Sequence, residues 1–592
     1  MDQTPLARYA ESLRASGSGA SLGLERKYPM FVIPLWFFLR MREILKHEDL
    51  LEAGSLCQYD HSMGRTMFVS HQWLGTRSPD PTFEQLRILQ KMLMHMMSGA
   101  ARVSLPIVTE LWFGRIKLPR TEDFTQQPLY LWYDYFCIPQ GAAASEVRQN
   151  AISSIPSYIS ESYFFVILCP SVTHEEGHVL GFESWAERGW CRLERMARNL
   201  SREDGFLISV QVASLPTLAN DLGGLVQAPG KGRFSIQADR SSFGPVLVKM
   251  MWAKLHNLLF KGDLHEYRFL LNLQRHYFGG LGIEPMESLV PGFCTEIDPS
   301  TDPYRFVVAK FLHENGFNSV GERDKQGWSP MCYAVLRDDP FLVESMLICR
   351  ADVNDTNHKV KKDAQLPKGM PVLALCGTYH SNQAMKALLL ARANVNAKDG
   401  LGGNALTASI GMDNTEGVRI LSEANIDPNV KLLPGTGPFK VACGFARLGT
   451  IREFMRRFPE MVNLRFCLHF GVIFNADVQT VSFLLESSAD INEQLEIPMR
   501  KKGWWLLLKL LSFRHKVSPS ALTYLAYNHR GATPLMLSIM TGKFDVTALL
   551  LSMGARLDLV NYRGKSAADI VEETRAPISL EGSEDDDSVI AI

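Results

Sequence analysis

A short pattern that recurs through the C-terminal half of the chain constrains the fold more than any other feature. Its clearest copy runs from Asn528 to Asp558 and reads NHRGATPLMLSIMTGKFDVTALLLSMGARLD. Within it, Thr533 suits the cap of a helix, Pro534 its first turn and Gly542 its end. One helix pair of this kind cannot bury its own apolar face, so the pattern predicts a stack of similar units. The second helix has an apolar stripe of Val546, Leu549 and Leu550.

Weaker copies lie upstream, and each carries a small residue five positions after the helix cap, where the two helices of a unit approach. The cap and small residues are Ser329 and Ala334, Asn404 and Ser409, Gly437 and Ala442, and Thr533 and Ser538. The pattern resembles the ankyrin repeat, which implies an all-α ankyrin-repeat solenoid of about seven units over residues 301–575. We expect equivalent unit ends at Ala351, Ala393, Ala424, Ala489 and Ala555. The last two are 66 residues apart, twice 33, which predicts one degenerate unit between them.

The N-terminal half alternates short apolar strands with helical segments, which predicts a parallel sheet with helices on both faces. We expect neighbouring parallel strands at Met67–Ser70, Tyr130–Tyr135 and Phe164–Leu168, and a helix at Glu183–Arg198. Ligands of such sheets bind beyond the C-terminal ends of the strands. The side chains expected there are Ser70, His71, Trp73 and Asp134.

The order of four segments in this half is similar to the Toll/interleukin receptor (TIR) domain. The segments read FVSH, WYDYF, FFVILCPS and RGWCRLE. The stretch LWYDYFCIPQ also resembles a signature of fungal heterokaryon-incompatibility (HET) domains. The resemblance implies a TIR/HET-like, flavodoxin-like α/β parallel-sheet domain that serves as an effector or a self-association module. The connection between Gly99 and Gln127 is longer than is typical of the TIR family.

Some TIR domains cleave NAD at the nicotinamide bond, which needs a carboxylate beside an oxocarbenium-like ribose. By resemblance, Glu194 of RGWCRLE is the candidate catalytic residue. The alternative is that Glu194 pairs with Arg195 or Arg198 on a solvated helix, because many TIR domains are adaptors without activity. NAD would be a substrate, and no cofactor is expected. The candidate substrate-binding residues are Ser70, His71, Trp73, Asp134 and Trp190, the last one helical turn before Glu194.

Three other candidate sites carry less specific signals. Cys137 or Cys191, with His71 as the base, has the residue types of thiolate chemistry. Residues 174–178 read HEEGH, which only partly resembles a zinc motif because its glycine weakens a helix. We expect a solvated loop there and no metal site. The Gly-Lys pair at residues 230–231 lacks the Ser or Thr of a phosphate-binding loop.

Residues 499–516 read MRKKGWWLLLKLLSFRHK and combine basic flanks with two tryptophans and a run of leucines. A helix of this composition suits a membrane surface or a calmodulin-like partner. The segment also lies where the degenerate repeat is expected. A buried repeat helix with lysines on its outer face is therefore the alternative.

Composition narrows the functional class. Lys and Arg total 62 and Asp and Glu total 63, a net charge of -1, so the overall charge does not favour a nucleic-acid reader. The ten cysteines form no CxxC pair and suit a reducing compartment, and the N-terminus does not read as a secretory signal. We expect a cytoplasmic protein without a transmembrane segment.

The expected organisation has five parts. We interpret the chain as a signalling or scaffold protein that binds protein partners through its repeats, with self-association of the TIR/HET-like domain as a further contact. An NAD-cleaving hydrolase is the alternative function. The parts are a helical extension at 1–60, the TIR/HET-like domain at 61–215, a loop and helical connector at 216–300, the repeats at 301–575 and an acidic disordered tail at 576–592.

Overall fold

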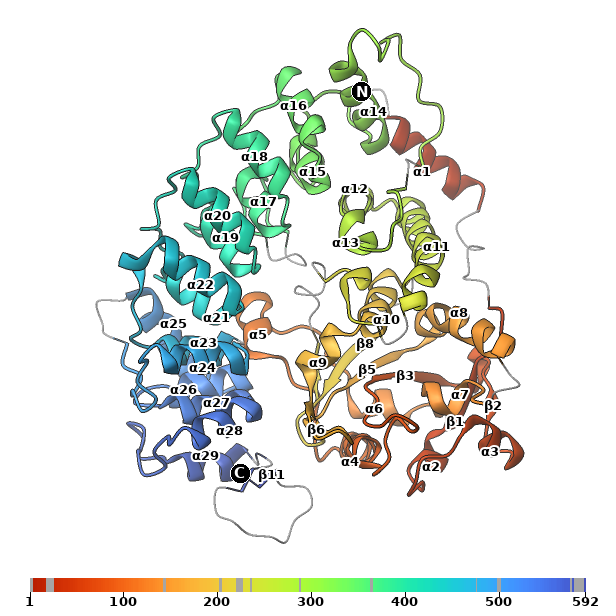
Figure 1. Cartoon of the computed structure of the whole chain (residues 1–592), viewed down its shortest axis with the longest axis vertical. Coiled ribbons are helices and arrows are strands. Elements are labelled where there is room, and N and C mark those ends of the chain that lie inside the picture. The colour runs from red at the N-terminus through yellow and green to blue at the C-terminus, as the bar shows by residue number, and fades with distance from the viewer. Residues whose placement is uncertain are drawn as a thin grey trace. The chain divides into compact units, whose positions relative to one another are not determined.

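The structure, a computed structural model, divides the chain into two compact units, each described here by itself (Figure 1). The sheet unit comprises Tyr9–Leu105 and Ile116–Leu289. The solenoid unit comprises Met1–Arg8, Pro106–Arg115 and Val290–Ile592. The residues that the structure describes are 4–17, 26–141, 145–201, 205–219, 227–234, 237–286, 289–361, 366–474, 476–497, 502–574, 576, 578–579 and 590–591.

The sheet unit is built on one seven-stranded sheet in the order β2-β1-β4-β3-β5-β8-β9. Strands β4, β3, β5 and β8 are parallel, which confirms the predicted pairing of the three central segments. Strands β1, β2 and β9 add antiparallel edges. The strands are β1 (Phe31–Pro34), β2 (Cys57–Gln58), β3 (Arg65–His71), β4 (Leu129–Trp132), β5 (Phe164–Leu168), β8 (Phe206–Val210) and β9 (Thr217–Leu218), with β6 (Val172–Thr173) and β7 (Val179–Leu180) in a separate hairpin.

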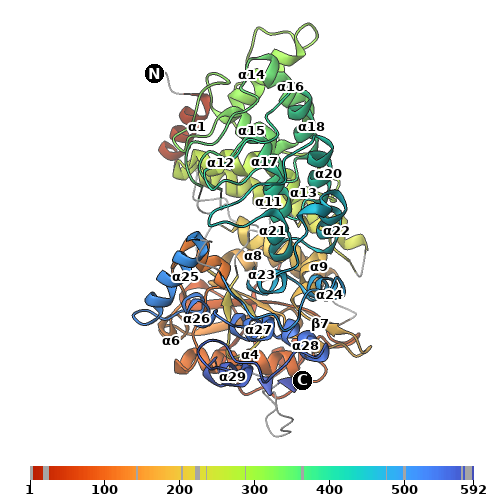
Figure 2. The ribbon, with the colours of Figure 1, turned by 90° about the vertical axis from the view of Figure 1, so that its left-hand side faces the viewer.

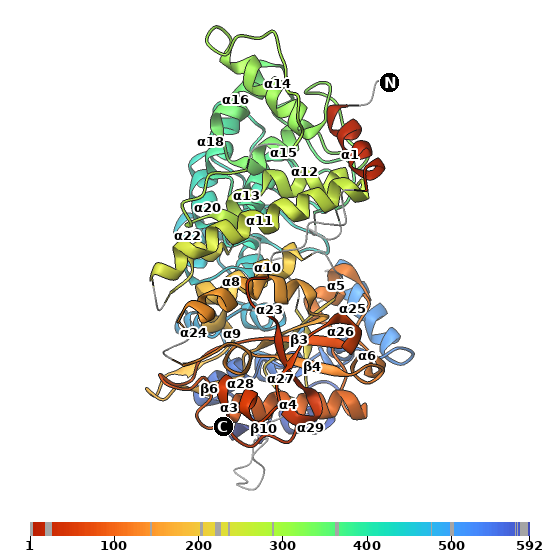
Figure 3. The same cartoon turned by 90° about the vertical axis from the view of Figure 1, so that its right-hand side faces the viewer.

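Helices cover both faces of this sheet (Figure 3). The helices α8 (Ser145–Glu161) and α10 (Gly189–Leu200) lie on one face, and α4 (Glu84–Ser98) and α6 (Thr121–Thr125) lie on the other. All five residues of β5, FFVIL, are buried, as expected for a strand that is covered on both faces. On the α8 face, the ring of Phe68 stacks on those of Trp132 and Phe165, with centroids 4.4 and 5.2 Å apart.

The predicted N-terminal extension, 1–60, contributes to the sheet as well as to helices. It contains the edge strands β1 and β2 besides three helices. Strands of four and two residues are too short to show the alternation by which a strand is recognised in a sequence. The expected boundary at residue 61 therefore lies inside the sheet unit. The helices are α1 (Pro5–Ala15), α2 (Leu35–Phe38) and α3 (His47–Glu52).

Two predicted elements of the sheet unit have different bounds. The strand expected at Tyr130–Tyr135 ends at Trp132, and α7 (Asp134–Cys137) follows it. The helix expected at Glu183–Arg198 is two helices, α9 (Phe182–Glu187) and α10. The chain is extended at Arg188 between them, because the N–H of Gly189 donates to the carbonyl of Arg233 at 2.8 Å instead of continuing the helical ladder.

The predicted connector, 216–300, is only partly a connector, because Thr217–Leu218 form the edge strand β9 and residues 290–300 cluster with the solenoid unit. Its helical part clusters with the sheet unit. It begins with α11 (Gln237–Lys261), which packs on α8 and α10. A break at Gly262 and Asp263 separates it from α12 (Leu264–Asn272), and α13 (Gln274–Phe278) follows. Asp263 caps α12 by accepting a hydrogen bond from the backbone N–H of Glu266.

The solenoid unit is a stack of helix pairs (Figure 2). Within the described residues, the first helices of six pairs form one row of contacts and the second helices form another. At the two ends, α14 (Pro303–Asn315) packs on the second row and α29 (Ala567–Thr574) on the first. The six pairs are α15 (Pro330–Arg337) with α16 (Pro340–Ile348), α17 (Val372–Thr378) with α18 (Asn382–Leu390), α19 (Ala405–Gly411) with α20 (Thr415–Glu423), α21 (Pro438–Phe445) with α22 (Leu448–Arg457), α23 (Cys467–Phe474) with α24 (Val478–Glu486), and α27 (Pro534–Thr541) with α28 (Phe544–Ser552).

The predicted caps and small residues of the repeats occupy their expected places. The side chains of Ser329, Asn404 and Thr533 each accept a hydrogen bond from a backbone N–H in the first turn of a helix. Thr547 of α28 donates to Ser538 of α27 at 2.8 Å, so the small residue does join the two helices of a unit. The four small residues, Ala334, Ser409, Ala442 and Ser538, have no exposed surface.

Five of the six described units end in a left-handed residue followed by a backbone hydrogen bond to the carbonyl five residues earlier, whereas α22 ends at Phe458 with negative φ. The residues with positive φ are Arg350, Arg392, Asn425, Ser488 and Gly554. The residues after them, which donate these bonds, are Ala351, Ala393, Ile426, Ala489 and Ala555. The prediction of Ala424 as an equivalent end is therefore wrong, and Ile426 takes that place. The left-handed residue, not the alanine, terminates the helix.

The expected degenerate repeat between Ala489 and Ala555 is instead an inserted helical hairpin. Its helices are α25 (Lys502–His515) and α26 (Ala521–Asn528), yet α27 packs directly on α23 and α28 packs directly on α24. Asn492 accepts the backbone N–H of Arg556 at 2.8 Å, the bond that Asn396 makes with Asp427 of its own neighbouring unit. The spacing of 66 residues is thus one repeat plus an insertion of similar length, not two repeats.

The long connection between Gly99 and Gln127 supplies a helix to the solenoid unit. This helix, α5 (Ile107–Phe113), packs on α23 and on α26 of the inserted hairpin. Its buried Glu110 accepts a hydrogen bond from Ser520 at 2.9 Å. The long connection between Gly99 and Gln127 therefore provides a helix that packs within the solenoid unit. Of the tail expected to be disordered, only residue 576 and the paired strands β10 (Ile578–Ser579) and β11 (Ile590–Ala591) lie among the described residues.

Candidate functional site

The candidate site lies at the C-terminal end of β3, in the middle of the parallel strands. The four parallel strands lie side by side in the order β4, β3, β5, β8, although β3 comes first in the chain. The chain passes from β3 to β4 on one side of β3 and then from β4 to β5 on its other side, so the strand order reverses at β3, and ligands of doubly wound sheets bind at such a point. Ser70 and His71 are the last two residues of β3, and because they are consecutive their side chains point to opposite faces.

Ser70 joins a cluster on the face covered by α10. Its hydroxyl donates to Oε2 of Glu194 at 2.5 Å and accepts from the indole N–H of Trp185 at 3.0 Å. Ser70 is 1 % exposed, Trp185 is buried and Glu194 is half-buried. The structure therefore brings together Ser70 and Glu194, which lie 124 residues apart in the sequence, and it does not leave Glu194 on a solvated helix.

His71 joins a second cluster on the opposite face. Its Nε2 lies 2.8 Å from Oδ1 of Asp134, and its Nδ1 lies 3.1 Å from the hydroxyl of Tyr133. The imidazole also stacks on the ring of Tyr133, with centroids 4.0 Å apart. Trp73 donates its indole N–H to Oδ2 of Asp134 at 3.4 Å. Both oxygens of Asp134 are thus held by predicted site residues.

The pKa values of the two carboxyl groups of the site, Glu194 and Asp134, are shifted in opposite directions. Burial raises the pKa of Glu194 to about 7, and the hydrogen bond from Ser70 and the charge of His71 offset this only in part. Burial also raises the pKa of Asp134, but the charge of His71 and the hydrogen bonds from His71 and Trp73 outweigh it, so the net pKa lies below the usual value. A carboxyl with a pKa near neutral pH beside one that stays ionised is the arrangement of many acid–base sites.

The hydrogen bond to Ser70 comes from a tryptophan that was not predicted. Trp190 lies one turn before Glu194 on α10 and is half-buried, but the hydrogen bond to Ser70 comes from Trp185 of α9. No motif in the sequence marks Trp185 as a site residue. Its indole reaches the strand end because α9 and α10 are separate helices, and a single continuous helix was expected.

Two further residues of the site were not predicted. Tyr133 belongs to the WYDYF motif but was taken as part of a strand. Asp80 is fully buried, accepts the backbone N–H groups of Glu84 and Leu86 at the start of α4, and interacts electrostatically with His71. An Asp before a helical segment is the usual sign of such a cap.

The alternative of a cysteine nucleophile finds no support in the geometry. The thiols of Cys137 and Cys191 donate to backbone carbonyls, at 3.9 and 3.8 Å, and both side chains are buried. Burial raises the pKa of each thiol, which disfavours the thiolate. The two nitrogens of His71 are engaged with Asp134 and Tyr133.

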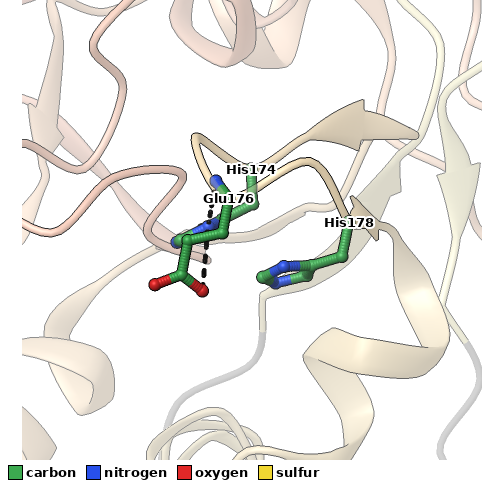
Figure 4. Close-up of side chains that lie close together, drawn as sticks. All are labelled: His174, Glu176 and His178. Atoms are coloured by element: carbon green, nitrogen blue, oxygen red, sulfur yellow. Dashed lines mark hydrogen bonds and ion pairs between the residues drawn. The ribbon is translucent and has the colours of Figure 1, made fainter.

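His174, Glu176 and His178 lie together on the β6–β7 hairpin (Figure 4). One possible ligand atom of each lies within 4.8 Å of the others, and the two imidazole rings stack with centroids 4.4 Å apart. Nδ1 of His174 already accepts the backbone N–H of Glu176 at 3.1 Å. These three residues could supply two nitrogens and a carboxylate to a metal ion, but His174 would have to exchange that backbone hydrogen bond for the metal.

Comparison with known proteins concerns the solenoid unit. A family model described as "Ankyrin repeat" matches residues 530–562. The solenoid contains an ankyrin repeat at these residues. Among solved structures, the chain is similar to the human ASB11 ankyrin repeat domain at 19 % identity and a TM-score of 0.29, over 41 % of this chain and 91 % of that one. No curated protein matches the chain. Among the described residues, no helix has the length and apolar character needed to cross a membrane.

Proposed function

We propose that the protein is a cytoplasmic signalling scaffold that binds protein partners along the loops between its ankyrin repeats. The observation that carries this proposal is a row of loop tips joined by backbone hydrogen bonds. The N–H groups of His358, Gly400 and Leu433 each donate to a carbonyl in the preceding loop, at 2.8–2.9 Å. A rigid, continuous row of this kind suits protein recognition, because little conformational freedom is lost on binding.

Apolar side chains protrude from this row. Isolated exposed apolar residues are common, but a series of them at equivalent loop tips forms a repeated contact surface. Aromatic and aliphatic side chains of this kind supply most of the binding energy at protein interfaces. The exposed side chains are Val360, Leu433, Val560 and Tyr562, which are 55, 65, 47 and 55 % exposed.

A comparison of two variants tests this surface. Leu433→Asp and Tyr562→Ala together should abolish the co-purification of those partners that bind the loops. Leu390→Asp is the matched control, because Leu390 is 82 % exposed but lies at the end of a second-row helix, α18. Quantitative mass spectrometry of proteins cross-linked to each variant gives the measurement. Partner sets that do not differ between the loop variant and the control would contradict the proposal.

For the sheet unit we propose a TIR/HET-like role in effector function or self-association. Its strand order is the flavodoxin-like one that the resemblance implies, and RGWCRLE and FVSH meet through Glu194 and Ser70. Sedimentation velocity over a wide concentration range tests self-association of the purified protein. A sedimentation coefficient that stays at the monomer value throughout would contradict it.

The second candidate function is cleavage of NAD, and the environment of Glu194 favours it. An ionised carboxylate next to a developing oxocarbenium ion stabilises positive charge, and Ser70 orients that carboxylate. Since the pKa of Glu194 is about 7, activity should rise as the pH increases through about 7. Nicotinamide release by the purified protein gives the measurement.

Two variants separate catalysis from folding in that assay. Glu194→Gln keeps a side chain that can hydrogen-bond to Ser70 but removes the charge, so it should abolish turnover. Glu183→Gln, an exposed position on α9, should leave turnover unchanged. Turnover that survives Glu194→Gln would defeat the assignment, and a wild-type protein without nicotinamide release would leave the scaffold as the function.

A further inference from the structure

The inserted hairpin carries a helix, α25, with apolar stripes on two opposite sides. Residues three, four and seven apart share one side of a helix, and the exposure of the side chains differs between the two sides. The inward stripe is Trp504, Leu508, Leu511 and His515, which are buried or half-buried. The outward stripe is Leu506, Leu510 and Phe513, which are 51, 61 and 70 % exposed, and Val517, 78 % exposed, follows it in the turn after the helix.

The inward stripe fixes the orientation of α25. The indole N–H of Trp504 donates to Thr436 at 3.2 Å, and its ring contacts that of Phe470 with centroids 5.7 Å apart. Near the other end, Nδ1 of His515 lies 3.2 Å from the hydroxyl of Thr523 on α26. Leu508 and Leu511 line an apolar cavity of about 120 Å³ bounded by α5, α23 and α26. The helix therefore cannot rotate to bury its outward stripe without losing these contacts.

Basic residues border the outward stripe. Lys502 and Lys509 are exposed and seven residues apart, so they lie on one side of it, and the exposed Lys516 follows in the turn after the helix. Arg514 lies on the other side, where its guanidinium is 3.8 Å from the carboxylate of the buried Glu110 on α5, so among the described residues of α25 and the turn after it the unpaired positive charge is that of the lysines. Residues 499–518 contain no Asp or Glu, although the whole chain has a net charge of -1. The positive charge is thus concentrated where the apolar side chains protrude.

We propose that the outward face of α25 docks on an anionic lipid membrane. Leucine and phenylalanine on one side with lysines beside them are typical of helices that lie in a membrane interface. A partner that wraps around a helix would need both sides of α25, and the inward side is already packed. Within the helix the outward stripe runs from Leu506 to Phe513, roughly 10 Å, and presents its side chains to one plane. This proposal is independent of the functions proposed for the loops and for Glu194.

Vesicle co-sedimentation of the full chain tests the proposal. Vesicles of phosphatidylcholine with phosphatidylserine should bind the protein, vesicles of phosphatidylcholine alone should bind it far more weakly, and added salt should reduce the binding. Changing Lys502, Lys509 and Lys516 together to Gln should weaken binding about a hundredfold, from ~1 kcal/mol per lysine. The double variant Leu510→Glu/Phe513→Glu should abolish binding.

Controls keep the result interpretable. Leu390→Glu, which places a charge at an equally exposed leucine outside the hairpin, should bind vesicles like the wild type. All variants should melt like the wild type, because the altered side chains are exposed. Equal binding to neutral vesicles, or unchanged binding by the lysine variant, would overturn the proposal. Binding of calcium-loaded calmodulin without binding of anionic vesicles would also overturn it and would assign the face to an acidic protein partner.

Discussion

Ser70 in the sheet unit and Ser538 in the solenoid unit are both buried serines with hydrogen-bonded hydroxyls, but their partners differ. Ser538 donates to the carbonyl of Leu535 at 2.7 Å and accepts from Thr547 at 2.8 Å, and neither partner titrates. Ser70 donates to Glu194, whose pKa is raised to about 7. The same residue type therefore joins two helices in one unit and holds an ionisable group in the other.

This difference has a consequence for stability. A buried group whose pKa differs between the folded and unfolded chain makes the free energy of unfolding depend on pH. The packing contacts of Ser538 should contribute equally at every pH between 4 and 9, because none of the groups involved ionises in that range. The cluster around Ser70 should not. Variants in the two units should therefore differ both in the size of the change in the free energy of unfolding and in its dependence on pH.

The largest effect is expected in the solenoid unit. Leu550 is fully buried in α28, so Leu550→Ala should lower the free energy of unfolding by about 2–5 kcal/mol, through lost transfer energy and a cavity. Leu549, the neighbour in the apolar stripe, is only half-buried, so Leu549→Ala should lower the free energy of unfolding by less. Urea denaturation followed by circular dichroism gives the measurement. Leu390→Ala is the control, with a change within about 0.5 kcal/mol. A loss below about 1 kcal/mol for Leu550→Ala would contradict the packing.

Local signals explain which parts of the solenoid unit could be predicted from the sequence. The caps Ser329, Asn404 and Thr533 and the small residues after them depend on contacts within a few residues, so their pattern is visible in the chain. The hairpin of α25 and α26 was missed because its length nearly equals one repeat. Only the direct contact of α27 with α23, which no local pattern encodes, identifies it as an insertion.

The candidate site shows the same limit. Ser70, His71 and Asp134 were predicted because the ends of parallel strands meet at one edge of a sheet. Their division into two clusters follows from the alternation along β3, but the partner of each cluster depends on where distant helices lie. Trp185 reaches Ser70 only because the chain is extended at Arg188, and that break depends on a hydrogen bond to Arg233.

The second prediction concerns Glu194, for which a solvated position was the alternative to a site role. The folded chain holds its proton up to about pH 7, whereas the unfolded chain releases it near 4.5. The folded state binds the extra proton between these values, so the free energy of unfolding falls as the pH rises from about 4.5 to about 7. Glu194→Gln removes this penalty. It should stabilise the protein by up to about 3 kcal/mol at pH 8 and by little at pH 4.

Thermal or urea denaturation at several pH values checks this prediction. Glu183→Gln, at an exposed position on the preceding helix, should show no comparable gain at pH 8. A stability difference between Glu194→Gln and the wild type that is constant from pH 4 to pH 8 would mean that Glu194 is fully solvated. The strand-end cluster would then lose its central group.

The third prediction has the opposite sign. The pKa of Asp134 lies below its usual value of 3.8, so the ionised carboxylate stabilises the folded chain at neutral pH. Asp134→Asn should therefore destabilise the protein by about 1–2 kcal/mol at pH 7, since hydrogen bonds to charged groups are the stronger ones. The difference should shrink as the pH falls below 3.8 and through the lower pKa of the folded state. A loss that does not change with pH would argue against the pair with His71.

The smallest effect tests the insertion itself. Asn492 accepts the backbone N–H of Arg556 across the inserted hairpin, just as Asn354 accepts the N–H of Asn394 in a regular pair of units. If the hairpin lies outside the stack, Asn492→Ala and Asn354→Ala should each cost about 0.5–1 kcal/mol, because each removes one partly solvated hydrogen bond between neighbouring repeats. Urea denaturation of both variants gives the comparison, with the exposed Leu390→Ala as a baseline. A clear cost for Asn354→Ala with none for Asn492→Ala would mean that α25 and α26 separate the two units, as a true repeat would.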